Sequence, residues 1–333
     1  MASYSEPIEF QRAIADTSTR RRHLLLGNGF SIAAHRQFNY GSLYEVAVRR
    51  DDAIADLFAE LGTENFEVAL LAAREPEDAA RIRSALYDAV VSVHPRHGEL
   101  GAAARNICAE FLADFTGIAR DPLRGKIFTT NYDLMLYWVI VAHSASLKCR
   151  DGFDADYVWK PGRDPKTFVY FLHGALHIHQ RPMGVAGKVL QIEKLRSSTK
   201  ASLLIQVRKH LDQGEFPLLI SEAEPTHKNA LIRRNPYLRA AQRAFQSACN
   251  DDENALFVIG HGLGEMDLHI TDAIPNGRVK SVFVSTYSPA DRDRAAYVAA
   301  QWAQTRATNG GPPIAVRTFD VGECPIWASA AVR

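Results

Sequence analysis

A short apolar run that ends in a glycine turn limits the fold of this chain more than any other stretch. Leu24–Leu26 is followed by Gly27-Asn28-Gly29, and a helix-like pattern begins near Ser31. A strand, a glycine turn and a helix in this order are typical of the first unit of a nucleotide-binding α/β fold. Glycines without a Cβ atom let the backbone approach a phosphate closely, and free N–H groups at a helix start favour an anion. Ser31 is expected either to cap this helix or to bond a phosphate.

The turn departs from the dinucleotide fingerprint of dehydrogenases. Its third glycine is missing, because Gly29 is followed by Phe30, Ser31 and Ile32. No acidic residue ends a recognisable second strand about 20 residues further on. The stretch alone therefore leaves two interpretations equal: a phosphate-binding loop, or an ordinary turn in which the glycines serve geometry only.

Strand-like and helix-like segments alternate along the chain, which predicts an α/β fold with a Rossmann-like, doubly wound and mostly parallel sheet. Strands are expected at residues 23–26, 126–129, 167–172, 216–220, 255–259, 279–285 and 314–319. Helices are expected at residues 134–143, 200–211, 226–233, 236–248 and 291–306, and a small hairpin or irregular excursion at 183–199.

Residues 42–120 differ in composition and contain no convincing strand. Alanine, leucine, glutamate and arginine dominate, and apolar residues such as Ile54, Leu57, Phe58 and Leu61 recur at helical spacing. This pattern predicts a helical insertion at 42–120 within a Rossmann domain formed by residues 1–41 and 121–333. The insertion is expected either to gate or assemble the protein, or to act as a simple lid or core-completing layer.

Small or polar residues follow almost every predicted strand. Because ligands bind at the carboxyl ends of strands in such sheets, these residues are candidates for one shared site. They are Gly27-Asn28-Gly29, Thr130-Asn131-Tyr132-Asp133, His173-Gly174, Ser221-Glu222, Gly260-His261-Gly262 and Ser285-Thr286.

The individual candidates have structural alternatives. Asn131 and Asp133 can face a ligand, or Asn131 can close the turn while Asp133 caps the next helix. His173 is placed either as a general base or as a structural histidine. No nearby carboxylate pattern completes a site around His173 and His177, so no metal is expected.

Composition excludes several classes of protein. The formal net charge of +1 gives no field that would attract nucleic acid or an acidic membrane. The four cysteines form no C-x-x-C pair, so neither a structural zinc site nor a disulfide framework is expected. The N-terminus has no apolar signal segment, and the most apolar stretch, 136–142, is too short to span a bilayer. A soluble, cytoplasmic protein is expected.

Taken together and in this order, the motifs resemble the sirtuin superfamily. That family has a glycine-rich G-x-G-x-S loop, then T-x-N-x-D, then H-G, and then a late strand followed by glycine and serine. The matching segments are Gly27-Asn28-Gly29-Phe30-Ser31, Thr129-Thr130-Asn131-Tyr132-Asp133 and His173-Gly174. The segments LLISEAEPTHKNALIRRNPYL (218–238) and VIGHGLGEMDLHI (258–270) resemble bacterial sirtuin-like proteins of the DUF4917 type. The resemblance spans about residues 23–290.

The resemblance implies NAD+ as the substrate and assigns site residues by motif. The implied cofactor-binding residues are Gly27, Asn28, Gly29, Phe30, Ser31, Thr130, Gly260, His261 and Ser285. The glycine loop would line the pyrophosphate, and the last three residues would flank the adenosine end. Asn131 and Asp133 would hold the nicotinamide ribose and amide region, and His173 would be the catalytic base.

Two departures from the sirtuin pattern argue against protein deacylation. The chain cannot build the four-cysteine zinc module, and residues 35–40 read HRQFNY where deacylases have a G-I-P-D-F-R-like run. These departures favour the zinc-less branch, whose characterised members resemble NAD hydrolases of anti-phage defence. A gated NAD+ hydrolase is therefore expected, as a homo-oligomer or with a separate sensor or ATPase protein. The alternatives are a non-catalytic module that senses NAD or ADP-ribose, and an effector resembling the AbiH abortive-infection group.

Overall fold

Six parallel strands form the central sheet of the computed structural model, which describes residues 6–162, 167–183, 189–196, 202–221 and 225–327. The strands are β1 (Arg21–Leu26), β2 (Ile127–Thr129), β3 (Val169–Phe171), β6 (Asn254–Ile259), β7 (Ser281–Thr286) and β8 (Ala315–Asp320). Their order is β3-β2-β1-β6-β7-β8. This is the order of a dinucleotide-binding Rossmann sheet, so the predicted fold class is confirmed.

The chain reverses its direction of winding between β1 and β6, which lie side by side at the centre of the sheet. Leu24 pairs with Ile127 of β2 on one side and with Phe257 of β6 on the other. In sheets of this kind the crevice outside the carboxyl ends of the strands at this switch point is the usual ligand site.

Both faces of the sheet are covered by helices, which explains why its inner strands are continuously apolar. All six residues of β6 are buried. Side chains alternate between the two faces. Leu24 and Leu26 belong to one core with Phe10 of α1 (Phe10–Asp16), and Leu25 belongs to the other with Phe245 of α12 (Pro236–Cys249).

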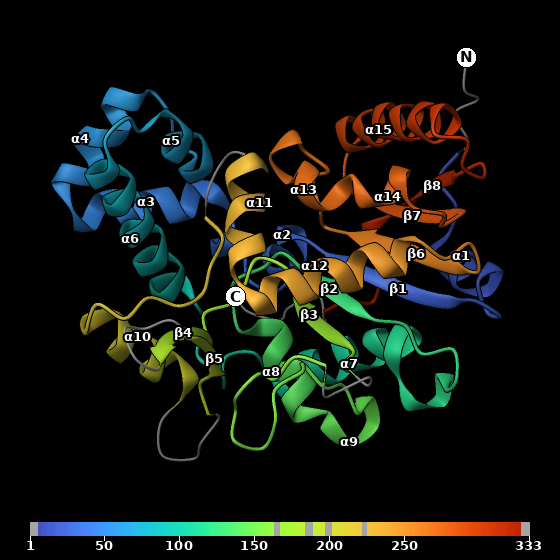
Figure 1. The fold of residues 1–333 in the computed structure, drawn as a ribbon, viewed down its shortest axis with the longest axis horizontal. Helices are drawn as coiled ribbons and strands as arrows, with labels where there is room; N and C mark the ends of the chain where they lie inside the picture. Colours follow the sequence, from blue (N-terminus) through green and yellow to red (C-terminus); the bar gives the residue numbers. More distant parts are fainter. Residues whose placement is uncertain (1–5, 163–166, 184–188, 197–201, 222–224, 328–333) are drawn as a thin grey trace.

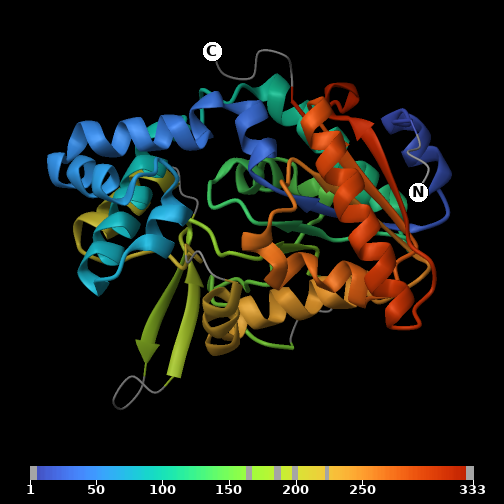
Figure 2. The same cartoon turned by 90° about the horizontal axis from the view of Figure 1, so that it is seen from above.

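Four helices form a group that lies beside the sheet rather than on its faces (Figures 1 and 2). They are α3 (Tyr40–Arg50), α4 (Asp52–Leu61), α5 (Phe66–Ala72) and α6 (Pro76–Val93). The next helix, α7 (Ala102–Thr116), packs against β1 instead. The group that stands apart from the sheet therefore ends with α6, within the range 42–120 predicted for the insertion.

The helical group has the local signals that helices need. The side chains of Asp51 and Asn65 accept hydrogen bonds from the first turns of α4 and α5. Pro76 occupies the first turn of α6, where its missing N–H removes no helical hydrogen bond. Asn235 and Pro236 begin α12 with both signals, a side chain that accepts hydrogen bonds from the first turn and a proline within that turn.

The remaining helices and the hairpin complete the chain. The α-helices are α2 (Asn28–Ala34), α8 (Met135–Ala142), α9 (Ser144–Leu147), α10 (Leu203–Asp212), α11 (Pro225–Arg234), α13 (Leu268–Thr271), α14 (Ala273–Asn276) and α15 (Pro289–Thr308). The hairpin consists of the antiparallel strands β4 (Ile178–Met183) and β5 (Val189–Lys194). Among the residues described, no helix combines the length and apolar character needed to cross a membrane.

One local prediction was wrong, and another had a wrong boundary. Residues 216–220 are not a strand of the sheet, because their only described pairing is a single bridge between Leu219 and Gly174. Ser221 therefore does not follow a sheet strand. The segment 183–199 was predicted as a small hairpin or an irregular excursion. Its described strand residues belong to an antiparallel hairpin, as the first alternative stated, but the first strand of this hairpin already begins at Ile178.

Candidate active site

The glycine turn after β1 is fixed by its contact with the loop after β6. A Cβ atom at Gly27 would lie 2.5 Å from the His261 Cα atom, and one at Gly29 would lie 2.7 Å from the Gly260 Cα atom. Gly29 N also donates a hydrogen bond of 2.8 Å to the Gly260 carbonyl oxygen. Gly260 has a φ of +64°, which favours glycine. The glycines thus bring the two central loops together at the switch point, whatever ligand they bind.

Ser31 neither begins nor caps the helix after this turn. The helix α2 begins at Asn28, and Gly27 is its N-cap residue. Ser31 lies inside α2 and is fully buried. Its Oγ donates a hydrogen bond of 2.5 Å to Asp133 Oδ2, so the predicted cap is replaced by a bond to the second motif.

Asn131 and Asp133 hold this second motif against the glycine turn. Asn131 Nδ2 donates to the Gly27 carbonyl oxygen at 2.9 Å and to Ser31 Oγ at 2.8 Å. Asp133 Oδ1 accepts from Met135 N at 2.8 Å, at the start of α8. Burial raises the pKa of Asp133, and the hydrogen bonds from Ser31 and the backbone oppose this shift. The structure therefore joins the first and second motifs into one buried network.

Several other predicted site residues lie at the same edge of the sheet, but their described contacts are with other parts of the protein. Asn28 Nδ2 donates to the Phe38 carbonyl oxygen at 3.2 Å. Phe30 is 1% exposed and packs against the Trp327 ring, with 4.9 Å between centroids. Ser285 Oγ accepts from Gly260 N at 3.0 Å, and Thr130 N donates to the Leu26 carbonyl oxygen at 3.1 Å.

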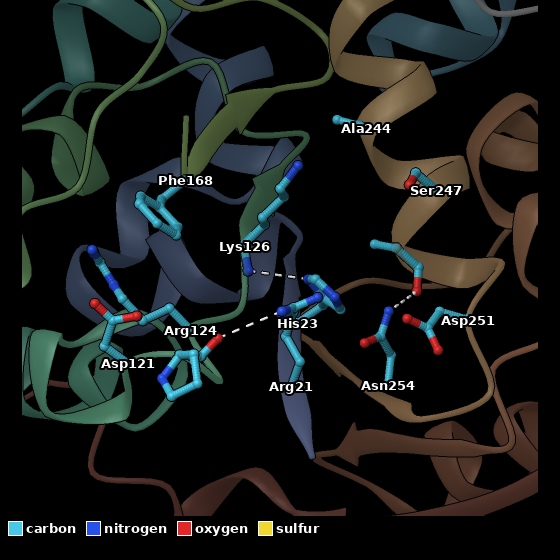
Figure 3. Close-up of a pocket in the computed structure, with 12 residues that line it drawn as sticks. Arg21, His23, Asp121, Arg124, Lys126, Phe168, Ala244, Ser247, Asp251 and Asn254 are labelled. Carbon is cyan, nitrogen blue, oxygen red and sulfur yellow. Dashed lines mark hydrogen bonds between the residues drawn. The ribbon is translucent and has the colours of Figure 1, made fainter. Parts of the chain in front are cut away.

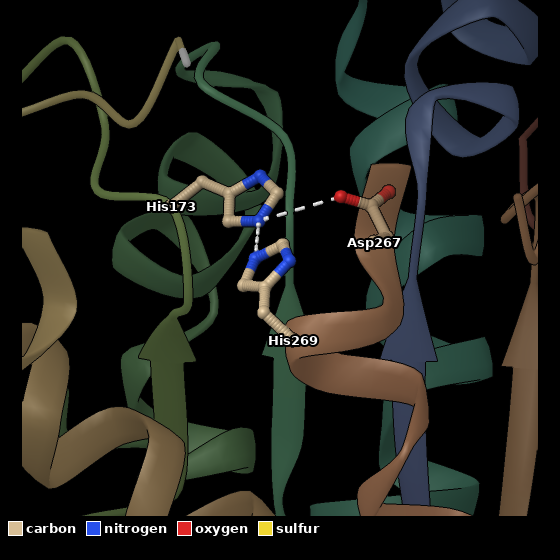
Figure 4. Close-up of side chains that lie close together, drawn as sticks. All are labelled: His173, Asp267 and His269. Carbon is tan, nitrogen blue, oxygen red and sulfur yellow. Dashed lines mark hydrogen bonds and ion pairs between the residues drawn. The ribbon is translucent and has the colours of Figure 1, made fainter. Parts of the chain in front are cut away.

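His173 follows β3 and is 2% exposed. The next residue, Gly174, has a φ of +77°, and a Cβ atom there would lie 1.8 Å from the Leu218 carbonyl oxygen. His173 Nε2 lies 2.8 Å from His269 Nε2, and the two rings stack with a 15° interplanar angle. Figure 4 shows these imidazoles converging with the Asp267 carboxylate.

Asp267 contacts several other charged or ionisable members of this second polar cluster. It ends the short helix η4 (Glu265–Asp267). Its Oδ1 lies 3.0 Å from Lys228 Nζ and 3.7 Å from His173 Nε2, and its Oδ2 lies 3.3 Å from His261 Nε2. Burial opposes its charge, but His261, His173 and Lys228 prevail and lower the pKa of Asp267. The imidazole of His261, implied to flank the adenosine end, therefore lies beside Asp267.

Burial keeps both stacked histidines neutral at ordinary pH. The pKa of His173 is well below its usual value, chiefly because burial disfavours the imidazolium. The nearby His269, Lys228 and His261 lower it further, while Asp267 opposes the shift. Burial likewise lowers the pKa of His269 to about 4. A neutral imidazole can accept a proton, which a general base requires.

The sequence prediction did not include Lys228, Asp267 or His269. Lys228 and Asp267 are more than 35 residues apart and come from different elements, so spacing along the chain could not join them. The Asp-x-His pattern of 267–269 within the quoted segment 258–270 was the available signal.

The cluster also contains three side chains of the types that bind metals. Ligand atoms of His173, Asp267 and His269 all lie within 4.8 Å of one another. The sequence prediction found no carboxylate near His173, and the structure supplies one from Asp267. However, the Lys228 ammonium already contacts the carboxylate oxygen nearest to His173, and its positive charge would repel a cation there. The metal-free site stays a prediction.

A separate cavity of about 430 Å³ lies at the opposite edge of the sheet (Figure 3). Arg21, His23, Arg124 and Lys126 are among its lining residues. Arg21, Arg124 and Lys126 lie at or just before the amino ends of strands, and His23 lies in the first half of β1. Ligands of open α/β sheets bind at the carboxyl ends, so we place the candidate active site at the edge formed by the glycine turn.

The fold and the site define a Rossmann-type α/β protein whose polar residues gather at the switch point. The family model "Domain of unknown function (DUF4917)" matches residues 24–327. The chain therefore belongs to the DUF4917 family, as its motifs predicted.

Similar solved structures include two Sir2 homologues. One, in complex with NAD, has 11% sequence identity and a TM-score of 0.34, and the match covers 90% of this chain and 94% of that one. The other, a mutant in complex with 2'-O-acetyl ADP-ribose, has 12% identity and a TM-score of 0.34, with 90% and 97% coverage. No curated protein matches the sequence.

Proposed function

We propose that this protein binds NAD+ and hydrolyses its nicotinamide–ribose bond to give nicotinamide and ADP-ribose. The observation that carries the proposal is the meeting of three motifs at one edge of the sheet. The glycine turn contacts Asn131 directly, and the neutral His173 follows the neighbouring strand β3. The family's motif order supports the choice of NAD+ over other nucleotides.

The proposed chemistry uses side chains alone. The nicotinamide–ribose bond breaks through an oxocarbenium-like state, because the leaving group departs before the nucleophile arrives. Asn131 and Asp133 would orient the ribose and a water molecule. His173 would accept a proton from a ribose hydroxyl or from water, an effect typically worth about 10²–10⁴-fold in rate.

The packing of these side chains supports gating. Asn131 is 8% exposed and Asp133 6%, so substrate must separate or displace their present partners. Because uncontrolled NAD+ cleavage harms a cell, we extend the proposal to a gated effector of anti-phage defence, which is drawn from the family resemblance. Assembly as a homo-oligomer, or with a sensor or ATPase protein, belongs to the same proposal.

The direct test is incubation of the purified protein with NAD+ and quantification of nicotinamide, ADP-ribose and cyclic products. We expect nicotinamide and ADP-ribose in equal amounts, and their loss in folded His173→Gln and Asn131→Ala variants. Protein that binds NAD+ yet releases no nicotinamide, with every candidate activator tried, would contradict the proposal.

A second candidate is a non-catalytic module that senses NAD or ADP-ribose. It is favoured by the observation that Ser31, Asn131 and Asp133 already satisfy one another by hydrogen bonds. In that case a His173→Ala variant would keep both its ligand affinity and its biological effect, whereas a hydrolase would lose the effect.

A further inference from the structure

A completely buried lysine lies next to the candidate base. The side chain of Lys228, on α11, is 0% exposed. Its ammonium lies 3.0 Å from Asp267 Oδ1 and 3.6 Å from Glu67 Oε1. A buried charge needs such partners, because an unpaired ion loses its hydration without compensation. The three residues form an ion triad in which one ammonium faces two carboxylates.

This ion triad links the helical group to the active site. Glu67 belongs to α5 of that group, and Asp267 belongs to η4 beside the site. Lys228 contacts both carboxylates from α11, which lies between α5 and α13 in Figure 1. Burial raises the pKa of Glu67, and Asp267 acts in the same direction while Lys228 opposes both. Lys228 therefore offsets part of the repulsion between the two carboxylates.

The triad also contacts the histidine pair. Asp267 Oδ1, which Lys228 contacts, lies 3.7 Å from His173 Nε2. A protonated His173 would compete with Lys228 for this oxygen. The 2.8 Å contact between His173 and His269 needs one N–H donor and one unprotonated nitrogen. Protonation of both rings would remove that acceptor and break the pair.

We propose that Lys228 is a positioning residue of the active site. Its ammonium, held between Glu67 and Asp267, offsets the two carboxylates and so preserves the neutral state that burial favours for His173, hydrogen-bonded to His269 and ready to accept a proton. This inference rests on the proposed function and deepens it. It also gives the helical group an electrostatic role, since α5 supplies one carboxylate of the triad.

Removal of Lys228 should make the surroundings of His173 more negative and so favour its protonated form. Among the described side chains facing His173, Lys228 is the only lysine or arginine. The groups that face it are His269 on α13, Asp267 on η4, His261 after β6, Lys228 on α11 and the Tyr132 ring after β2. Without the ammonium, Asp267 and Glu67 would favour the imidazolium form.

The test follows the protonation of His173 by NMR of its imidazole, assigned with a His173→Gln variant. In wild type we expect a neutral ring from about pH 6 to 8. In Lys228→Met the titration midpoint should rise by about one pH unit or more. In the pH profile of nicotinamide release, the acid limb should likewise move to higher pH. Lys228→Arg, which keeps the charge, should restore the wild-type titration.

Glu67→Gln is the matched control, because it removes a negative charge from the same triad and must not raise the midpoint. An unchanged His173 titration in a cooperatively folded Lys228→Met variant overturns the inference. If that variant does not fold, Lys228→Gln removes the charge while its amide can still donate to Asp267. If wild type releases no nicotinamide the proposed function fails, but the NMR titration still decides the role of Lys228.

Discussion

At the scale of single residues, Ser31 connects two motifs that are 100 residues apart. Its hydroxyl, which is fully buried, accepts a hydrogen bond from Asn131 and donates one to Asp133. Each partner would lose a hydrogen bond without this hydroxyl. Asp133 would lose the most, because its carboxylate is buried.

We predict that Ser31→Ala lowers the free energy of unfolding by about 1–3 kcal/mol, because a buried acceptor is left unpaired. Denaturant unfolding monitored by circular dichroism measures the change. Ser146→Ala is the control, since that exposed hydroxyl bonds only the His143 carbonyl oxygen, and it should stay within about 0.5 kcal/mol of wild type. Equal losses in the two variants would show that the Ser31 network adds no stability.

The sequence predicted this network only in part. It placed Ser31, Asn131 and Asp133 near one edge, because each follows an apolar run and parallel strands share that edge. It could not show that the three side chains bond one another. It also missed Lys228 and Asp267, whose meeting depends on how α11 and η4 pack rather than on any local pattern.

At the scale of elements, the end of β3 depends on one glycine. Gly174 combines a φ of +77° with a backbone contact that leaves no room for a Cβ atom. It also forms the bridge to Leu219. This bridge explains the position of the apolar run 216–220. The run lies against the loop at His173 and Gly174 instead of joining the sheet, and the periodicity of the sequence could not show this.

We predict that Gly174→Ala destabilises the protein by more than about 3 kcal/mol or prevents folding, because it adds a backbone clash to the left-handed strain. Gly214→Ala is the matched control. Gly214 has a similar φ of +72° but open space where the Cβ atom would go, so only about 1–2 kcal/mol should be lost. Thermal unfolding of both variants tests the difference, and similar losses would refute the role of the Leu218 contact.

His94 joins the helical group to the second motif. It follows α6, and its Nε2 accepts a hydrogen bond of 2.9 Å from Leu134 N while its Nδ1 lies 2.8 Å from the Pro95 carbonyl oxygen. This arrangement requires the neutral ring. Burial accordingly lowers the pKa of His94 to about 4.

We predict that His94 makes the protein less stable in acid. The unfolded chain binds the proton more tightly than the folded one, so the contribution is complete above about pH 6.5. It is lost as the pH falls from there towards about 4, and amounts to at most about 3 kcal/mol. The difference in unfolding free energy between wild type and His94→Gln, measured against pH, should shrink across this window. A difference that stays constant across this window for His94→Gln would contradict the prediction.

At the scale of the whole molecule, the fold gathers the polar residues of the candidate site and buries them. Ser31 is 0% and His173 2% exposed. Trp327, near the end of the described chain, covers the same region: its Nε1 donates a hydrogen bond of 2.8 Å to the Phe30 carbonyl oxygen on α2. If the proposed function holds, we therefore expect NAD+ to move α2 or the loops that face it when it reaches the glycine turn.

We predict that NAD+ binding changes the fluorescence of Trp327, because its ring lies against Phe30 beside the glycine turn. Titration of the His173→Gln variant with NAD+ should give a saturable change in emission without turnover. NAD+ at about 100 times its Kd should also stabilise the fold by about 2.7 kcal/mol. The Trp327→Phe substitution in this background should remove the emission change, whereas Trp302→Phe, on the outer helix α15, should keep it. If calorimetry detects NAD+ binding while Trp327 emission stays constant, the nucleotide enters without moving α2, and the covering of the site cannot be what gates it.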